Sequence, residues 1–497
     1  MTTLMAARDG HERWSLDVLS TELIVLVLRQ LWEGDSRSLG VVRLVSKRLN
    51  DAVVPIQYHT KRLTQRIIAP DAAVDFPEGV AHICAHTRHV RVDSELNVEH
   101  IKTLLEKMER LSSISWRFQQ DSLHQGEIWV PSGIIPRQRT HDVKLYVENV
   151  PLQDFRCERN NFYLRSMPPG TLVSLKMAAP IPPFTARVES LKGLLLNSPR
   201  LETFWYEERG QGTQFSFKPS ERFPPLKELS LRSYDWNHDA DAVRRHWHFS
   251  EIRRLELIDV PLNPFLSSVS FTDFQNLESL CLDDFSMHRP DTRQEATDGQ
   301  YALIKQIRAL AELKITCHTQ SFPLDGILQH ARSLRALRFR DYVGFADEDV
   351  RCPTLSIEDL DMMSRQLVNV RTLEIDMDGK LVETNSYIRT LCNFRQLSTL
   401  VLHTQTVVDP FHVDANRDRD KERAKEMISS LVRDKQGVSW RAITINVGGW
   451  KQIMVRRLAP PWRRLNGRGV YAERCFVMDR GEDGEVAVRE ELPVSTL

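Results

Sequence analysis

The sequence predicts a mixed fold, α+β / α/β in class, in which a bundle of three short N-terminal helices precedes a long solenoid of stacked strand–helix units. Three observations predict it. Residues 23–32 read LIVLVLRQLW, in which eight of ten residues are apolar. A motif L-x-x-L-x-L recurs seven times between residues 226 and 402. The composition, 41% hydrophobic and 27% charged, is that of a folded globular chain.

The charge balance excludes one class of function. The 497 residues include 67 basic and 67 acidic ones, so the formal net charge is +0. A nucleic-acid binder relies on a basic excess to neutralise phosphates, so we expect no nucleic-acid partner. Seven cysteines are scattered without a CxxC pair, which argues against zinc or redox sites and favours reduced thiols in the cytoplasm or nucleus. They are Cys84, Cys157, Cys281, Cys317, Cys352, Cys392 and Cys475.

The run LIVLVLRQLW predicts a helix with more apolar surface than one core can cover. It is too short to cross a membrane, which takes about 20 apolar residues, and no cleavage site follows it. Ser20 is the expected N-cap, and Leu19 is expected to pack on Ile24. The inward face is expected to hold Leu23, Ile24, Val27, Leu28 and Leu31. Because the helix is apolar nearly all round, we expect it to be buried on more than one side.

Two further short helices are predicted before residue 60. Gly34 and Asp35 end the first helix, and the second directs Leu39, Val42 and Val45 inward. Ser46 opens the third helix, which carries Leu49, Ala52 and Val53, and Pro55 stops it or turns the chain. Three short helices make only a small core, so the surplus apolar face needs a partner, either the rest of the chain or another protein.

These residues resemble an F-box, the adaptor-binding segment of SCF-type ubiquitin ligases, in its fungal form. The runs LSTELIVLVLRQL and SLGVVRLVSKRL follow the family pattern in one frame, although Ser20 stands where the family usually has proline and Leu49 where it often has tryptophan. The resemblance implies docking on the SCF adaptor subunit and, through it, on cullin. The residues expected to dock are Leu19, Leu23, Ile24, Val27, Leu28, Leu39, Val45, Lys47 and Leu49. The alternative is an ordinary helical cap on a larger domain.

The remaining chain is dominated by the repeated motif. Its copies are LKELSL, IRRLEL, LESLCL, LAELKI, LRALRF, VRTLEI and LSTLVL, and weaker copies lie at 90–92, 114–116, 143–145, 175–177, 204–206 and 443–445. Each copy predicts a short strand with two inward apolar residues, and stacked units would share one core. The pattern resembles an irregular leucine-rich repeat, but the position after the strand carries no run of asparagines. The alternative is a generic α/β domain.

Three segments interrupt the repeats. Residues 286–300 are expected to be a loop, 414–426 a solvated helix or a partly disordered segment, and 479–497 a loose acidic tail. The predicted organisation is therefore a flexible N-terminus (1–13), the F-box (14–63), the solenoid (64–450), and a C-terminal cap with the tail (451–497).

The sequence offers little for catalysis. It contains no G-x-S-x-G, P-loop or G-x-G-x-x-G motif. The region from His238 to His248 is rich in His and Asp and is the best metal candidate, but a polar connector with surface histidines is the favoured interpretation. For the basic segment 456–468 a solvated edge is favoured over an RNA or phosphoinositide patch. For the proline-rich segment 178–184 a rigid loop is favoured over a polyproline ligand. We therefore expect no enzyme activity, no cofactor and no metal.

The strands instead offer a surface, because alternate strand residues point away from the core. The charged residues of mixed sign at these positions would suit a protein substrate. They are Arg232, Arg254, Glu256, Asp283, Lys314, Arg338, Arg340, Glu374, Asp376 and His403. The resemblance thus implies a substrate-recognition adaptor of an SCF-type ligase. The alternatives are an interaction scaffold outside any ligase, with its helices as a cap, and an enzyme with a dispersed site.

Overall fold

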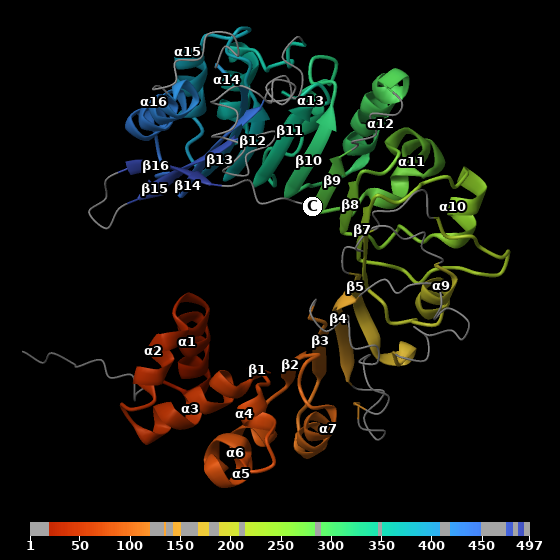
Figure 1. The fold of residues 1–497 in the computed structure, drawn as a ribbon, viewed down its shortest axis with the longest axis vertical. Coiled ribbons are helices and arrows are strands. Elements are labelled where there is room, and N and C mark those ends of the chain that lie inside the picture. The colour runs from red at the N-terminus through yellow and green to blue at the C-terminus, as the bar shows by residue number, and fades with distance from the viewer. Residues whose placement is uncertain are drawn as a thin grey trace, which may run out of the picture. The chain divides into compact units, whose positions relative to one another are not determined.

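The structure is a computed structural model of the whole chain, and it describes residues 19–119, 134–135, 143–150, 167–177, 188–207, 214–283, 290–345, 350–407, 418–448, 474–480 and 486–491. The chain divides into two compact units. The N-terminal unit comprises Met1–Ala178 and Gly193–Arg200, and the C-terminal unit comprises Ala179–Lys192 and Leu201–Leu497. Each unit combines helices with strands, so the expected mixed α/β class is confirmed (Figure 1).

The N-terminal unit starts with helices and continues with parallel strands. Its elements are α1 (Thr21–Gly34), α2 (Ser36–Val42), α3 (Lys47–Tyr58), β1 (Thr60–Arg62), α4 (Gln65–Ile68), α5 (Ala72–Asp75), α6 (Pro77–His86), β2 (His89–Asp93), α7 (Val98–Lys107), β3 (Ser113–Arg117), β4 (Lys144–Val150), a 3-10 turn (Pro169–Thr171) and β5 (Leu172–Met177). Strands β1 to β5 pair in parallel in sequence order. Helix α9 (Glu189–Leu196) spans the division between the two units.

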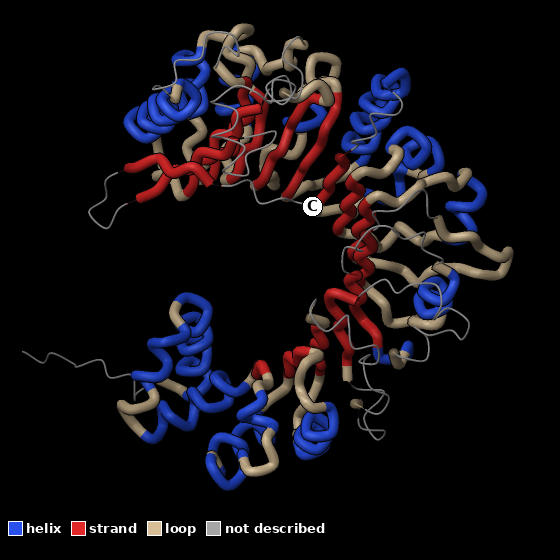
Figure 2. Tube along the Cα trace, viewed as in Figure 1, coloured by secondary structure: helices blue, strands red, loops and turns tan. Residues whose placement is uncertain are grey.

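The C-terminal unit alternates strands with helices. Its strands are β6 (Thr203–Glu207), β7 (Glu228–Arg232), β8 (Arg254–Ile258), β9 (Ser279–Asp283), β10 (Glu312–Cys317), β11 (Ala336–Asp341), β12 (Thr372–Asp376), β13 (Thr399–Gln405), β14 (Ala442–Gly448), β15 (Arg474–Arg480) and β16 (Val486–Glu491). Its helices are α10 (Ala240–His246), α11 (Leu262–Ser268), α12 (Arg293–Gln306), α13 (Asp325–Leu328), α14 (Ile357–Gln366), α15 (Thr384–Leu391) and α16 (Arg419–Asp434), with 3-10 turns at Phe271–Phe274 and Pro290–Thr292. Within this unit the helices lie along one face of the strands (Figure 2).

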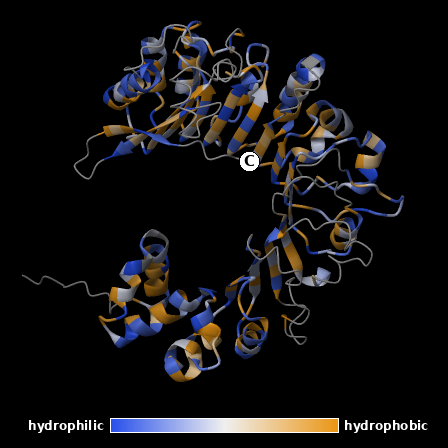
Figure 3. Cartoon of the chain, viewed as in Figure 1, coloured by the Kyte–Doolittle hydropathy of each residue, from blue (hydrophilic) through white to orange (hydrophobic). Residues whose placement is uncertain are grey.

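The repeated leucines fall into columns across the C-terminal unit. Strands β6 to β14 pair in parallel, and the central leucines of the motif are successive partners. The first column is Leu229, Leu255, Leu280, Leu313, Leu337, Leu373, Leu400 and Ile443, and all eight side chains are buried. Figure 3 shows the accompanying alternation as hydrophobic and hydrophilic bands along β10 and β11. The seven predicted strands and their six weaker copies are confirmed as strands.

Three predictions about the connecting segments need correction. Pro55 does not stop the third helix, because α3 runs on to Tyr58 around a packed Ala52, Val53 and Val54. The loop expected at 286–300 is wrong from Arg293 onward, where α12 begins. The charged segment 414–426 does enter a helix, α16, but Ala424, Met427, Ile428 and Leu431 on that helix are buried. Its solvation is therefore limited to one face.

The acidic end of the chain is not a loose tail throughout. Residues Val486–Glu491 form β16, which pairs antiparallel with β15. Arg474 on β15 is 1% exposed, and its guanidinium lies 2.7 Å from Glu490 and 2.7 Å from Asp418. A buried guanidinium needs compensating charge, so it holds the acidic strand in place. The sequence-predicted features within 1–18, 178–187, 408–417 and 449–473 lie outside the described residues.

Candidate protein-docking surface

The first forty residues of the described chain form a capped three-helix module, residues 19–58. Ser20 caps α1 by accepting the Leu23 N–H at 3.4 Å, and Ser46 caps α3 by accepting the Leu49 N–H at 3.2 Å. Asp35 serves two helices, because its N–H donates to Leu31 at the end of α1 and its carboxylate accepts the Arg37 N–H at the start of α2. These bonds satisfy helix-end groups that would otherwise be unpaired. The sequence-predicted caps are confirmed.

The module has a core of its own. Its buried residues are Ile24, Leu28, Leu39, Leu49, Ala52 and Val53, and Leu19, Val25, Leu31, Val42 and Ile56 pack against them. Four of the residues expected to dock on a partner, Ile24, Leu28, Leu39 and Leu49, are therefore inside the module, and Leu19 packs against its core. This corrects the expectation, because a side chain 0–4% exposed cannot contact a partner without unfolding the module.

A second set of apolar side chains remains on the outside of the module. Leu23, Leu26 and Val27 lie on α1 at the spacing i, i+3, i+4, which is one helical face. Val41 lies at the end of α2, and Leu44 and Val45 follow it in the turn before α3. All six are exposed, from 49% for Leu23 to 87% for Leu44. We call these six residues the exposed apolar face.

The exposed apolar face contains three of the sequence-predicted residues, Leu23, Val27 and Val45, and the predicted Lys47 is exposed beside them in the chain. Val45 was expected to point inward and does not. Leu26, Val41 and Leu44 were not among the predicted docking residues. The signal that could have found Leu26 is its i+3 spacing from Leu23, which places both on one side of a helix.

Helix α1 carries three distinct faces. Ile24, Leu28 and Leu31 form the stripe that packs into the core. At roughly 100° per residue, Leu23, Leu26 and Val27 lie on one flank of that stripe. Thr21, Val25, Arg29 and Trp32 lie on the other flank, where they line a cavity. Helix α1 was expected to be apolar nearly all round. One apolar face packs into the core of the module, a second apolar face is exposed to solvent, and the third face lines the cavity.

The charged strand residues proposed as substrate contacts pair mostly with one another. Arg338 on β11 lies 2.5 Å from Asp283 on β9 and 3.2 Å from Glu374 on β12, and His403 on β13 lies 3.0 Å from Glu374. Burial opposes ionisation of Glu374, but His403 and Arg338 outweigh it and lower its pKa to about 2. Asp283 also accepts a hydrogen bond from Thr316 at 2.8 Å. These four residues form one continuous network across four strands.

The other six proposed contact residues differ in the solvent exposure of their side chains. Asp376 is buried and bonds Arg340 at 3.0 Å. Arg232, Arg254 and Lys314 keep 40%, 65% and 42% of their side chains exposed. Their partners are Glu256 at 2.9 Å, Glu228 at 3.5 Å and Glu312 at 2.6 Å, respectively. The surface that remains open to a partner is therefore centred on β7 to β10.

Sequence reasoning missed one exposed aromatic residue on the same strand face. Trp205 on β6 is 40% exposed, and the strand register aligns it with Ser230, Glu256, Cys281 and Lys314 on the four following strands. Tryptophan is among the residues that most often dominate protein–protein binding energies. The strand around it, TFWYE, was recognised only for its inward residues, Phe204 and Tyr206.

The histidine-rich segment at 238–248 is a packing element. Burial, reinforced by the nearby His246, lowers the pKa of His238 to about 4. Its Nε2 lies 2.8 Å from the Tyr234 hydroxyl, and that hydroxyl accepts the Phe215 N–H at 2.9 Å. His246 Nδ1 lies 2.6 Å from the Glu221 carbonyl oxygen. Among the residues that the structure describes, no three His, Cys, Asp or Glu side chains are grouped as a metal site.

Comparisons with known proteins add no assignment: no protein-family model matches the sequence, and a search of curated proteins finds no match. No helix in the described ranges combines the length and apolar character that a membrane crossing requires.

Proposed function

We propose that this chain is an F-box protein, the substrate-recognition adaptor of an SCF-type cullin-RING ubiquitin ligase. In this proposal the module at the N-terminus docks on the SCF adaptor subunit. The strand–helix units form an irregular leucine-rich-repeat-like solenoid that holds a protein substrate. The chain contributes proximity and orientation to ubiquitin transfer and takes no part in the chemical step.

The observation that carries the proposal is the exposed apolar face. The module already has a closed core, so Leu23, Leu26 and Val27 are not needed to complete it. Large exposed apolar patches on folded proteins mark interaction sites, and the three α1 side chains share one helical face. The face lies within the segment whose sequence resembles an F-box, and the resemblance names the adaptor subunit as its partner.

The substrate surface follows from the strands of the C-terminal unit. Trp205, Arg232 and Lys314 lie on one strand face with partly exposed side chains. An aromatic residue flanked by charges of both signs suits a protein partner with an apolar anchor and charged rim. The Asp283, Arg338, Glu374 and His403 side chains form ion pairs with one another, so we propose that this network fixes the strand face and that contact with substrate is made around it.

Co-expression with the SCF adaptor subunit tests the proposal. We expect a stoichiometric complex on size-exclusion chromatography with the unmodified chain. Leu23→Asp with Val27→Asp should abolish the complex, because both carboxylates would be buried without partners at the interface. The matched control is Val74→Asp, which charges another apolar side chain, 80% exposed, on α5 of the same unit. If the unmodified folded chain ignores the adaptor, the proposal is wrong.

A scaffold outside any ligase is the second candidate, and one contact favours it. Helix α3 packs on α6, where the Tyr58 and His82 rings lie 5.3 Å apart, and it leads directly into β1, which pairs with β2. A module joined in this way could serve as a cap that covers the first strand edge. Limited proteolysis distinguishes the two: release of a folded fragment without residues 19–58 favours a separable F-box, and co-degradation of β1 to β3 favours a cap.

A further inference from the structure

A cavity of about 1020 Å³ in the N-terminal unit lies between the three-helix module and the segments that precede its strands. Helices α1 and α3 form one wall, and residues at the end of α6 and just before β2 and β3 form the other. Its lining is strongly basic. It includes five arginine and lysine residues and a single carboxylate, Asp51, so its formal charge is +4 with the histidines neutral.

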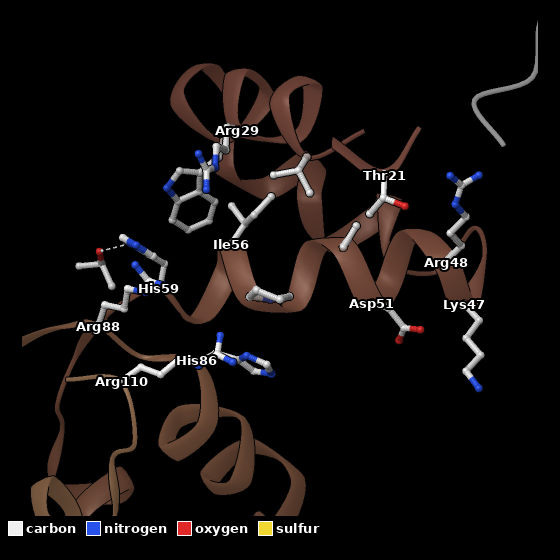
Figure 4. A pocket seen from close by; sticks show the side chains of 15 residues that line it. Thr21, Arg29, Lys47, Arg48, Asp51, Ile56, His59, His86, Arg88 and Arg110 are labelled. Atoms are coloured by element: carbon white, nitrogen blue, oxygen red, sulfur yellow. Dashed lines mark hydrogen bonds between the residues drawn. The ribbon is translucent and has the colours of Figure 1, made fainter. Parts of the chain in front are cut away.

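Three of the five cationic side chains and both histidines of the lining gather at one end of the cavity. Figure 4 shows Arg29, His59, His86, Arg88 and Arg110 drawn together there from separate segments, whereas Lys47, Arg48 and Asp51 lie toward the other end. Arg29 comes from α1, His59 follows α3, and His86 ends α6. Arg88 and Arg110 stand just ahead of β2 and β3. Residues far apart in the sequence have thus been brought to one place by the fold.

The three arginines at this end have no ion-pair partner in the described chain. None of the ion pairs found there involves Arg29, Arg88 or Arg110, in contrast to the paired arginines on the strands of the C-terminal unit. The Nδ1 atom of His86 is buried without a hydrogen-bond partner. Burial lowers the pKa of both His59 and His86, and the nearby Arg88 and Arg110, respectively, add to the effect. The site therefore carries uncompensated positive potential.

Helix ends do not account for this charge. Helices α3, α6 and α7 end close to the cluster, and a helix C-terminus carries roughly half a negative charge. Three such ends offset about 1.5 charges, whereas the three arginines carry three. Glu109, beside Arg110 in the chain and exposed, is a carboxylate that acts on His86 and raises its pKa against the larger effect of burial. A basic excess remains at the cavity after both contributions.

The backbone holds the cluster in a fixed arrangement. The carbonyl oxygen of His59 accepts the N–H groups of Arg88 and His89 at 3.0 and 3.1 Å. The carbonyl oxygen of Arg88 accepts those of Ser112 and Ser113 at 2.8 and 3.0 Å. The segment that carries Arg110 is tied to α6 by the bond from Glu109 N–H to the Cys84 carbonyl at 3.0 Å. Preorganised donors bind an anion without the entropy loss of ordering loops.

From this arrangement we propose that the cavity binds a small phosphorylated molecule that carries at least two phosphoryl groups. Three guanidinium forks match phosphoryl oxygens in geometry and charge. The apolar part of the lining, Val25, Trp32, Ala52, Pro55 and Ile56, would receive the carbon skeleton of the ligand. Because Arg29 and Leu23 lie on opposite flanks of α1, the ligand would hold the module against the strands without covering the exposed apolar face. The inference does not depend on the proposed ligase function.

Calorimetry on the full chain with pyrophosphate tests it. The expected result is saturable binding at one site and a rise in the unfolding temperature of the N-terminal unit. Arg88→Ala with Arg110→Ala should weaken the binding at least about tenfold. The control is Arg37→Ala, which removes an exposed arginine on α2 outside the cavity lining and should leave the affinity unchanged.

A charge-preserving pair guards against misfolding of the alanine variant. Arg88→Lys with Arg110→Lys keeps the charge but loses the guanidinium forks, so its affinity should fall between those of the unmodified chain and the alanine variant. The inference is overturned by any of three results. They are no saturable binding by the unmodified chain, full affinity in the folded alanine variant, or an equal loss in Arg37→Ala, which would indicate nonspecific attraction of polyanions.

Discussion

Leu23 and Leu28 lie five residues apart on α1 and point to different faces of the helix, Leu23 toward solvent and Leu28 into the core. Leu28 is 3% exposed and packs with Leu39 and Leu49, whereas Leu23 is 49% exposed. The two side chains look equivalent in the sequence, yet they have different functions in this account. Leu28 stabilises the module, and Leu23 is available to a partner. Variants that charge both positions would therefore confuse folding with binding.

Truncation at the two positions should separate these roles. Leu28→Ala is expected to cost about 2–5 kcal/mol of module stability, because it opens a cavity among tightly packed side chains. Leu23→Ala should change stability by no more than about 0.5 kcal/mol. Hydrogen exchange of the α1 to α3 amides measures both. Equal loss of protection in the two variants would show that Leu23 belongs to the core.

The buried network on the strands should depend strongly on its central cation. Arg338→Ala leaves Asp283, 2% exposed, and Glu374 without their shared partner, and we expect a loss of about 3–5 kcal/mol. The matched variant is Arg254→Ala, which breaks a pair whose arginine is 65% exposed. Such exposed pairs contribute about 1 kcal/mol or less. Denaturant unfolding of the full chain gives the comparison, and similar losses for both would contradict the burial of the network.

His238 should make the C-terminal unit sensitive to mild acid. Its pKa is about 4 in the folded chain against 6.5 for an ordinary histidine, because burial disfavours the imidazolium. As pH falls below 6.5, His238 becomes protonated in the unfolded chain but stays neutral in the folded chain, so the free energy of unfolding decreases. Below about pH 4 His238 is protonated in both states, and its contribution to the pH dependence ends. The loss amounts to about 3 kcal/mol. His238→Gln should flatten the stability profile between pH 6.5 and 4. An unchanged profile would show that His238 titrates normally.

Position 437 requires a glycine for two reasons, a positive φ and a close contact with a neighbouring backbone segment. Gly344 shares only the first of these, so it allows the two effects to be measured separately. The φ of Gly437 is +83°, and a Cβ there would collide with the backbone of Arg395, whose oxygen accepts the Val438 N–H at 2.8 Å. Gly344 also has a positive φ, +55°, but open space surrounds the position of its Cβ. Gly344→Ala should cost about 1–2 kcal/mol from backbone strain alone. Gly437→Ala should cost clearly more in the same denaturant unfolding, and an equal cost would exclude the steric contribution.

The strands could be predicted because their apolar residues are placed by a local rule. In each copy, two inward residues alternate with outward ones, and the leucine three residues before the central one is buried as well, as Leu277 is in LESLCL. Parallel neighbours bring equivalent positions side by side, so Leu280 partners Leu313 although 33 residues separate them. Repetition of one local pattern therefore predicts the long-range pairing.

The misassigned segments are those where polar residues are buried. Helix α12 was expected to be a loop, but Thr297 and Gln300 on it are 0% exposed. Gln300 donates to the Thr316 carbonyl oxygen at 3.1 Å, and Thr297 accepts the His318 N–H at 3.1 Å. Strand β16 is likewise held through Glu490 and the buried Arg474. Hydropathy does not reveal such partners, because they come from distant parts of the chain.

The sequence located the candidate docking surface in the three N-terminal helices, but it did not identify which apolar side chains of those helices are exposed. Periodicity located an amphipathic α1, but with Leu23, Val25, Leu26 and Val27 all apolar it could not choose the inward face. That choice depends on where α2 and α3 pack, which is a tertiary property. The basic cavity was not expected at all, because its arginines are distributed over about 80 residues from Arg29 to Arg110.

The most direct test of the central claim is the affinity of the purified full chain for the SCF adaptor subunit. It is measured for the unmodified chain, for Leu23→Asp with Val27→Asp, and for Val74→Asp. We expect tight binding by the unmodified chain and by Val74→Asp, and a loss of affinity of at least about a hundredfold in the double variant, whose α1 to α3 amides remain protected. Retained binding by a folded double variant would contradict the assignment of the exposed apolar face as the docking surface.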